Sequence, residues 1–294
     1  MRMEAVIRIC WALLLYCSMI AAHADIAMIA PSATAQAQKF AQMLEDSLKD
    51  TATPERVELV DLNSEVNLEK YRLIVTLSGS TLRQLIAEDR LPGNIPVVAS
   101  YLSRAEHREF RSYVASAVYS EAPLQRQLAL AEAIFGEKEV FGALVASDAS
   151  SLVSADNLRV YPVSEYDSLN HALVELLGSS RALIGVYDPD LYSAENIKSI
   201  LITSYRHNRP LIGPTQAYLK AGALASTYST PEDVVQRLTE IVNEGLSEAA
   251  TFPEADYNPY FSVGFNRQVG RSLNLLLPDS VDVAKRLRSQ ESDQ

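Results

Sequence analysis

The stretch AGALASTYSTPEDV, residues 221–234, joins a run of small residues to the start of a helix. Thr230 suits the N-cap, Pro231 suits the first helical position, and Asp233 can complete a capping box with Thr230. Before this cap, Gly222, Ala223, Ala225 and Ser226 carry little side chain, which lets another backbone or a ligand approach closely. The same pattern fits a strand end packed beneath a helix. A slim, uncharged connection also suits a chain that crosses between two lobes and lines a cleft.

Around this stretch, short apolar runs alternate with segments whose apolar residues recur at helical spacing. Strands that are apolar throughout, separated by helices, are typical of a parallel sheet covered on both faces. A first series of strands is expected at 26–30, 57–60, 73–77 and 95–99. A charged segment without periodicity, 101–112, interrupts the pattern. A second series is then expected at 113–119, 140–146, 158–161, 182–187 and 210–213.

The interrupted pattern predicts an α/β protein of two Rossmann-like lobes, each with a parallel sheet, joined by a hinge. The N-terminal lobe is expected to contain residues 25–108 and 224–255. The C-terminal lobe is expected to contain residues 109–223 and 256–294. The segment FPEADYNPYFS, residues 252–262, would then form a third crossing between the lobes.

Residues 1–24 have the pattern of a secretory signal peptide. Arg2 and Arg8 give a positive start, residues 9–20 are almost continuously apolar, and residues 22–24 supply a small-x-small cleavage site. The apolar run is too short for a membrane span. We therefore expect export to the periplasm and a mature protein that is not inserted in the membrane.

Composition restricts the chemistry and the partners of the mature chain. Both cysteines, Cys10 and Cys17, and the one tryptophan, Trp11, lie in the expected leader, so disulfide and thiol chemistry are excluded. A lipid anchor at Cys17 would need a small residue before it, and Tyr16 occupies that position. With 26 Lys and Arg against 37 Asp and Glu, the net charge is −11. This acidity argues against nucleic acid as a partner.

Polar residues follow several of the expected strands, at the edge where helix N-termini offer free backbone amides. The segment LSGST, residues 77–81, is the most informative. Gly79 lets the backbone come close, while the hydroxyls of Ser78, Ser80 and Thr81 can bind a carboxylate or another polar group. Helix capping alone would explain one such hydroxyl. Further ligand-binding candidates of this kind are Ser32, Ser147 and Asp148.

Tyr187 and Asp188 follow a second-lobe strand and are also candidates. The Asp188 carboxylate can pair with an amino group of a ligand, and the Tyr187 ring can stack on one. Alternatively, Asp188 and Pro189 simply form a turn. Because the expected mature chain lacks tryptophan, other aromatic contacts to a ligand must come from tyrosine or phenylalanine. Tyrosines near expected strand ends or in loops are Tyr101, Tyr119 and Tyr218.

The run RPLIGPTQAYLKAGALASTYSTPEDV, residues 209–234, resembles the strand, loop and crossing segment of the ABC transporter substrate-binding proteins. Similar patches occur at residues 71–80, 181–201 and 261–280. The resemblance implies the type 1 periplasmic-binding fold of two hinged α/β lobes. The chain departs from the usual family pattern at 111–113, where members carry Gly-Val-Ser or Gly-Thr-Ser. It departs again at 147–151, where they have an Asn-Pro-rich loop.

Two functions follow from this resemblance. In the first, the protein captures a small polar ligand, for example an amino-acid-like one, between its lobes and delivers it to an ABC permease. In the alternative, the ligand-bound protein docks on the periplasmic sensor domain of a membrane receptor, such as a sensor kinase or a cyclase, without transport. The sequence has no nucleophile elbow, phosphate-binding loop, dinucleotide fingerprint or His-Glu-x-x-His motif. We therefore expect no catalytic residues, no metal and no cofactor.

Overall fold

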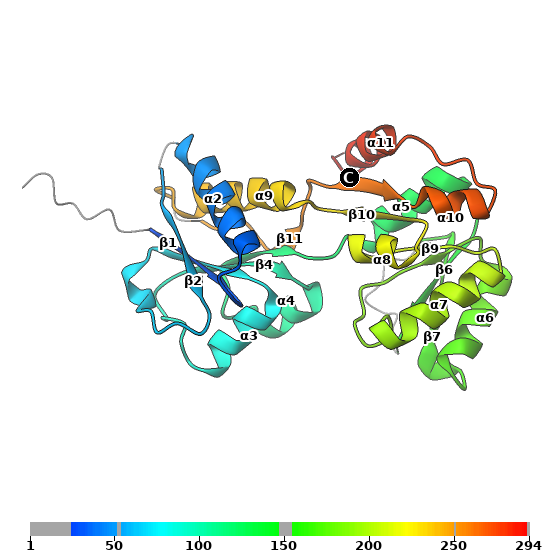
Figure 1. The fold of residues 1–294 in the computed structure, drawn as a ribbon, viewed down its shortest axis with the longest axis horizontal. Helices are drawn as coiled ribbons and strands as arrows, with labels where there is room; N and C mark the ends of the chain where they lie inside the picture. Colours follow the sequence, from blue (N-terminus) through cyan, green and yellow to red (C-terminus); the bar gives the residue numbers. More distant parts are fainter. Residues whose placement is uncertain (1–24, 52–53, 147–154, 250, 293–294) are drawn as a thin grey trace, which may run out of the picture.

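The computed structural model describes residues 25–51, 54–146, 155–249 and 251–292. These residues form two α/β lobes that lie side by side, each built on a six-stranded sheet (Figure 1). The expected fold class, two α/β lobes with largely parallel sheets, is therefore confirmed. The expected signal peptide, residues 1–24, lies outside the described residues.

The first sheet has the strand order β11-β5-β4-β3-β1-β2, and all its pairs are parallel. In β1 every residue is buried, because helices cover both faces of the sheet. The strands are β1 (Ile26–Ala30), β2 (Val57–Asp61), β3 (Leu73–Leu77), β4 (Val97–Leu102), β5 (Ser116–Tyr119) and β11 (Asp256–Tyr257).

Two hydrophobic clusters lie on the two faces of this sheet. Ile26 and Met28 of β1 pack with α2 (Ala35–Lys49) and α9 (Pro231–Gly245) on one face. Ala27 and Ile29, which point the other way, pack with α3 (Gly79–Ala87) and α4 (Arg104–Phe110). A short 3-10 helix, η1 (Leu68–Lys70), precedes β3.

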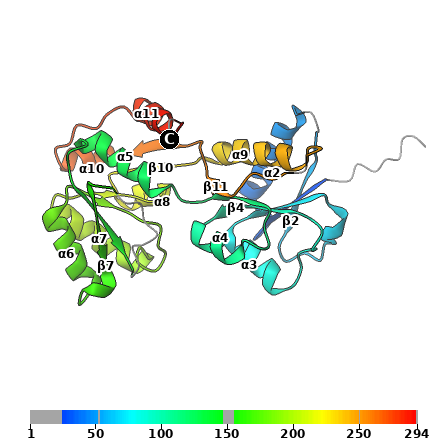
Figure 2. The same cartoon turned by 180° about the vertical axis from the view of Figure 1, so that it is seen from behind.

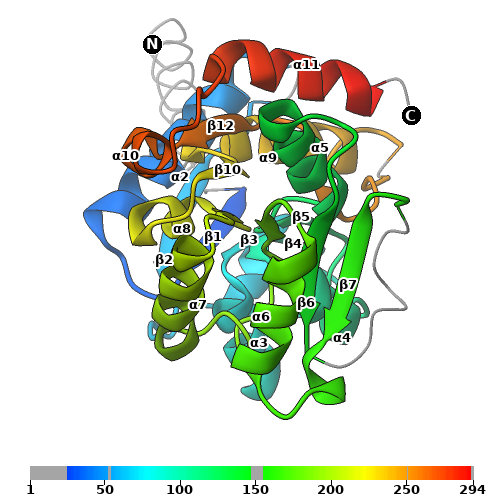
Figure 3. The same cartoon turned by 90° about the vertical axis from the view of Figure 1, so that its right-hand side faces the viewer.

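The second sheet has the order β12-β10-β9-β8-β6-β7, and only β12 runs antiparallel to its neighbour. Helices α5 and α11 cover one face and α6 and α7 the other, and Figure 3 shows α11 beside α5. The strands are β6 (Phe141–Val145), β7 (Leu158–Pro162), β8 (Leu183–Ile184), β9 (Leu211–Ile212), β10 (Ala225–Tyr228) and β12 (Ser262–Phe265). The helices are α5 (Leu124–Phe135), η2 (Val163–Glu165), α6 (Leu169–Ser179), α7 (Ala194–Arg206), α8 (Gln216–Ala221), α10 (Arg267–Ser272) and α11 (Ser280–Ser292).

Three segments carry the chain between the sheets, and we propose lobe boundaries at these crossings. The first joins β5 to α5 and is seen from behind in Figure 2. The second joins β10 to α9, and the third joins β11 to β12. The second crossing ends at the helix start expected from the sequence, because Thr230 caps α9 and forms a capping box with Asp233.

Sheet membership corrects our expectation for three strands. The strand expected at 113–119 in the second lobe is β5, which pairs with β4 in the first sheet. Likewise β11, expected in the C-terminal lobe, pairs with β5, while β10, expected in the N-terminal lobe, pairs with β9. The charged segment that we took for a break between lobes contains helix α4. Within helix α4 the only buried residue is Phe110, so the helix has no apolar periodicity that the sequence could reveal.

Candidate ligand-binding site

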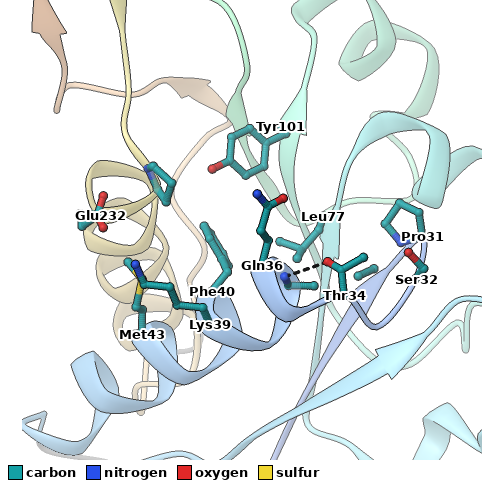
Figure 4. A pocket seen from close by; sticks show the side chains of 13 residues that line it. Pro31, Ser32, Thr34, Gln36, Lys39, Phe40, Met43, Leu77, Tyr101 and Glu232 are labelled. Carbon is teal, nitrogen blue, oxygen red and sulfur yellow. Dashed lines mark hydrogen bonds between the residues drawn. The ribbon is translucent and has the colours of Figure 1, made fainter. Parts of the chain in front are cut away.

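The carboxyl ends of β1, β3 and β4 border a cavity of about 610 Å³, which we call the first-lobe cavity (Figure 4). Helix α2 contributes Phe40 and Met43, β3 contributes Leu77, β4 contributes Tyr101, and α9 contributes Pro231. Five exposed polar residues also line it: Ser32, Thr34, Gln36, Lys39 and Glu232. The cavity therefore combines an apolar inner wall with a polar rim, which is typical of small-molecule sites.

Tyr101 has an unusual backbone in this cavity. Its φ is +54°, in the left-handed region, and the register of β4 against β5 shifts between Ser100 and Leu102. A β-bulge of this kind redirects the side chain at the end of a strand. The Tyr101 ring lies against Phe40, with ring centroids 6.0 Å apart and planes at 56°. Partial burial, together with the charges of Glu232 and Asp233, raises the pKa of Tyr101 to about 12.

A second cavity, of about 220 Å³, has walls from both lobes, and we call it the inter-lobe cavity. Arg104 and Arg108 come from α4, Glu121 comes from the first crossing, Tyr257 comes from β11, and Tyr187 follows β8 of the second lobe. Within the described residues, neither Arg104 nor Arg108 forms an ion pair with an acidic side chain. Their positive charges therefore remain available to an anionic group.

Glu121 is the acid of the inter-lobe cavity. Its Oε1 accepts a hydrogen bond from the backbone N–H of Arg104 at 2.9 Å, and its Oε2 accepts one from the Ser120 hydroxyl at 3.0 Å. Burial raises the pKa of Glu121 despite these bonds. Burial also raises the pKa of Tyr187, and the charges of Glu121 and Glu106 raise it further. Tyr187 of the second lobe therefore senses the charges of two first-lobe-side carboxylates, of which Glu121 lines the cavity.

The LSGST residues form a cap at the start of α3. The Ser78 hydroxyl accepts a hydrogen bond from the Thr81 N–H at 3.1 Å and lies 2.9 Å from the hydroxyls of both Ser80 and Thr81. A Cβ placed on Gly79 would lie 2.3 Å from Glu106 Oε1, so glycine allows α3 and α4 to pack closely. None of these four residues lines either cavity. The geometry accounts for them as a helix cap, and their contact with a ligand stays a prediction.

Of the other sequence candidates, one lines each cavity, and the rest line neither or lie outside the described residues. Ser32 lines the first-lobe cavity and Tyr187 lines the inter-lobe cavity. The carboxylate of Asp188 accepts hydrogen bonds from the backbone N–H groups of Asp190 and Leu191 at 3.1 and 2.9 Å, as the alternative of a turn requires. Ser147 and Asp148 lie outside the described residues. The structure does not bring all these candidates to one place.

Sequence reasoning missed Arg104, Arg108 and Glu121, the charged residues of the inter-lobe cavity. From the sequence, Arg104 and Arg108 belong to a charged segment without periodicity, and Glu121 has no predicted role. A capping box at Ser103 and Glu106 was the available signal, because it marks the start of α4. Recognising that helix would have placed Tyr119 at the end of a first-sheet strand and Glu121 two residues after it.

Comparison with known proteins supports the fold. No family model matches this sequence, and no curated protein matches it. Among solved structures, the ligand-free, open form of a substrate-binding protein with adhesive properties from Clostridium difficile has a TM-score of 0.64 at 13% identity. That match covers 87% of this chain and 97% of the other. The chain has the type 1 binding-protein fold.

Two further structures share this type 1 binding-protein fold. A conserved domain protein from Vibrio cholerae has a TM-score of 0.51 at 12% identity, over 89% of this chain and 98% of the other. An ABC domain from Streptococcus pneumonia in complex with L-Trp has a TM-score of 0.50 at 15% identity, over 88% and 97%. The type 1 binding-protein fold expected from the resemblance is therefore confirmed.

Two features are absent from the described residues. These residues contain no cluster of three or more His, Cys, Asp or Glu side chains arranged to hold a metal ion. None of their helices combines the length and the apolar character that crossing a membrane requires.

Proposed function

We propose that this protein is an exported solute-binding protein that captures a small polar, amino-acid-like ligand between its two lobes. The inter-lobe cavity is the observation that carries the proposal. It holds two arginines without ion pairs and one partly buried carboxylate, Glu121. A zwitterion needs one partner of each sign: Arg104 and Arg108 pair with its carboxylate, and Glu121 pairs with its ammonium group. The pneumococcal structure with the same fold holds an amino acid, L-Trp, which supports this ligand class.

Closure of the lobes follows from the two-sided lining of the cavity. Arg104 lies on the first lobe, and Tyr187 lies on the second. A ligand that contacts both has a larger interaction free energy with the closed state than with the open state, so it shifts the population toward closure. The three crossings supply the hinge. The size of the shift depends on this difference in free energy, and total affinity does not determine it.

We further propose that the closed form delivers its ligand to an ABC permease from the periplasm. The resemblance, the two-lobe fold and the leader-like residues 1–24 support this use. The proposal requires no chemical change to the ligand, and it assigns no catalytic role to any residue.

The proposal is tested by a thermal-shift screen with the twenty amino acids, followed by small-angle scattering with any that bind. At a ligand concentration of 100 times Kd, stability should rise by about 2.7 kcal/mol, and the radius of gyration should decrease. Arg104→Gln together with Arg108→Gln should abolish the shift, whereas Arg111→Gln, outside the cavity, should preserve it. If no amino acid raises the melting temperature, the ligand class is wrong. Binding without any uptake defect in a deletion strain would instead favour docking on a receptor.

A further inference from the structure

The first-lobe cavity is distinct from the inter-lobe cavity, and their lining residues do not overlap. Its inner wall contains Phe40, which is 7% exposed, Met43 and Leu77. Its charged residues, Lys39 and Glu232, are both exposed at the rim. A volume of about 610 Å³ falls within the range that holds small organic ligands. The interior therefore favours an uncharged group.

Tyr101 lines this wall although its left-handed backbone conformation is unfavourable for a tyrosine. Left-handed φ values are uncommon for residues other than glycine, asparagine and aspartate, and strained backbone of this type clusters at ligand sites. Glycine would adopt this backbone conformation without steric cost. The tyrosine instead puts its ring, 36% exposed, against Phe40 at the cavity wall.

The ring arrangement indicates the chemistry of the occupant. The two planes meet at 56°, so the wall presents both a ring face and a ring edge, the two surfaces that aromatic partners use. A tyrosine hydroxyl is uncharged at neutral pH, since its ordinary pKa is about 10, so Tyr101 places no charge in the cavity. Apolar Met43 and Leu77 extend the surface beyond the ring pair.

We infer that the first-lobe cavity binds a neutral aromatic compound of one or two rings, packed against Tyr101 and Phe40. This site lies wholly on the first lobe and the first turn of α9. It therefore does not depend on lobe closure or on the proposed capture of an amino-acid-like ligand.

Isothermal titration of the exported protein with indole tests this inference. Tyr101→Phe keeps the ring and should bind indole as the wild type does. Tyr101→Gly suits the positive φ, so it should fold normally, yet it removes the ring and should weaken binding at least about tenfold. Circular dichroism and urea unfolding of each variant check that the fold is intact.

Arg108→Gln in the inter-lobe cavity is the matched control and should leave indole binding unchanged. The inference is overturned if the wild type fails to bind indole at millimolar concentration, or if Tyr101→Gly binds it as well as the wild type. An effect of Arg108→Gln equal to that of Tyr101→Gly would overturn it as well, because indole would then occupy the inter-lobe cavity. Failure of the amino-acid screen would leave these results unaffected, so the two proposals are tested separately.

Discussion

Arg126 and Glu291 are 165 positions apart in the sequence and form a two-point ion pair, with Nε–Oε1 and Nη2–Oε2 distances of 2.6 and 2.9 Å. The same guanidinium donates to the carbonyl of Asn258 at 3.0 Å and lies 3.9 Å from the ring centroid of Phe261. Arg126 is 5% exposed. One side chain of α5 therefore holds both the C-terminal helix α11 and the third crossing in place.

Glu291→Ala should destabilise the protein by about 2 kcal/mol. It leaves the buried Arg126 charge without its acidic partner, a cost reduced because Glu291 is itself one-third exposed. Urea unfolding measures the change. Asp46→Ala, which breaks the exposed pair with Lys49, is the control and should give no measurable change. Equal effects of the two substitutions would contradict a stabilising role for the Arg126–Glu291 pair.

Gly79→Ala should destabilise the protein by about 1 kcal/mol or more, because the new Cβ would collide with the Glu106 carboxylate that caps α4. Gly93→Ala is the matched control, because a Cβ at Gly93 meets no atom within 4 Å. In a double-mutant cycle, the cost of Gly79→Ala should shrink when Glu106 is already alanine. Additive effects in thermal unfolding would show that the two residues do not interact.

Thr76→Val should stabilise the protein by about 1 kcal/mol. Thr76 is fully buried in β3, and its hydroxyl has no hydrogen-bond partner in the part of the chain that the structure describes. Thr81→Val provides the contrast, since the equally buried Thr81 hydroxyl bonds with Ser78, and its loss should cost about 1 kcal/mol. Chemical denaturation of both variants distinguishes them, and a shared sign would refute the expectation.

Glu121→Gln should remove a pH dependence of stability. Because burial raises the pKa of Glu121 above its ordinary value of 4.5, the folded state holds this proton more tightly than the unfolded state. Wild-type stability should therefore fall as pH rises from about 4.5 through the folded-state pKa, and the variant should lack this fall. Urea unfolding from pH 4 to 8 measures the difference.

Asp61→Asn serves as the control of opposite sign. Backbone N–H groups of Asn63 and Ala33 lower the pKa of Asp61, so its ionised form favours the folded state. The wild type should lose this contribution as the pH falls below the ordinary value of 3.8 and through the lowered folded-state pKa, so this series extends below pH 4. Asp61→Asn should lack that loss. The account of Glu121 fails if the wild type and Glu121→Gln have parallel pH profiles.

Local patterns in the sequence determined the class of fold and some helix ends. Apolar runs that alternate with amphipathic segments predict covered parallel sheets, since only strands buried on both faces lack polar positions. Thr230, Pro231 and Asp233 predicted the start of α9, and the capping box is present there. These features depend on residues within a few positions of one another, so the sequence is sufficient to predict them.

Tertiary structure alone decided which strands share a sheet and which side chains meet. A strand as short as β5 carries no signal that distinguishes the two sheets, because its pairing depends on contacts with β4 and β11. Tyr187 meets Arg104 and Glu121 only where the two lobes face each other. The residue type at position 101, a tyrosine, likewise does not predict the left-handed backbone found there. Each of these features comes from long-range packing, which can override local preference.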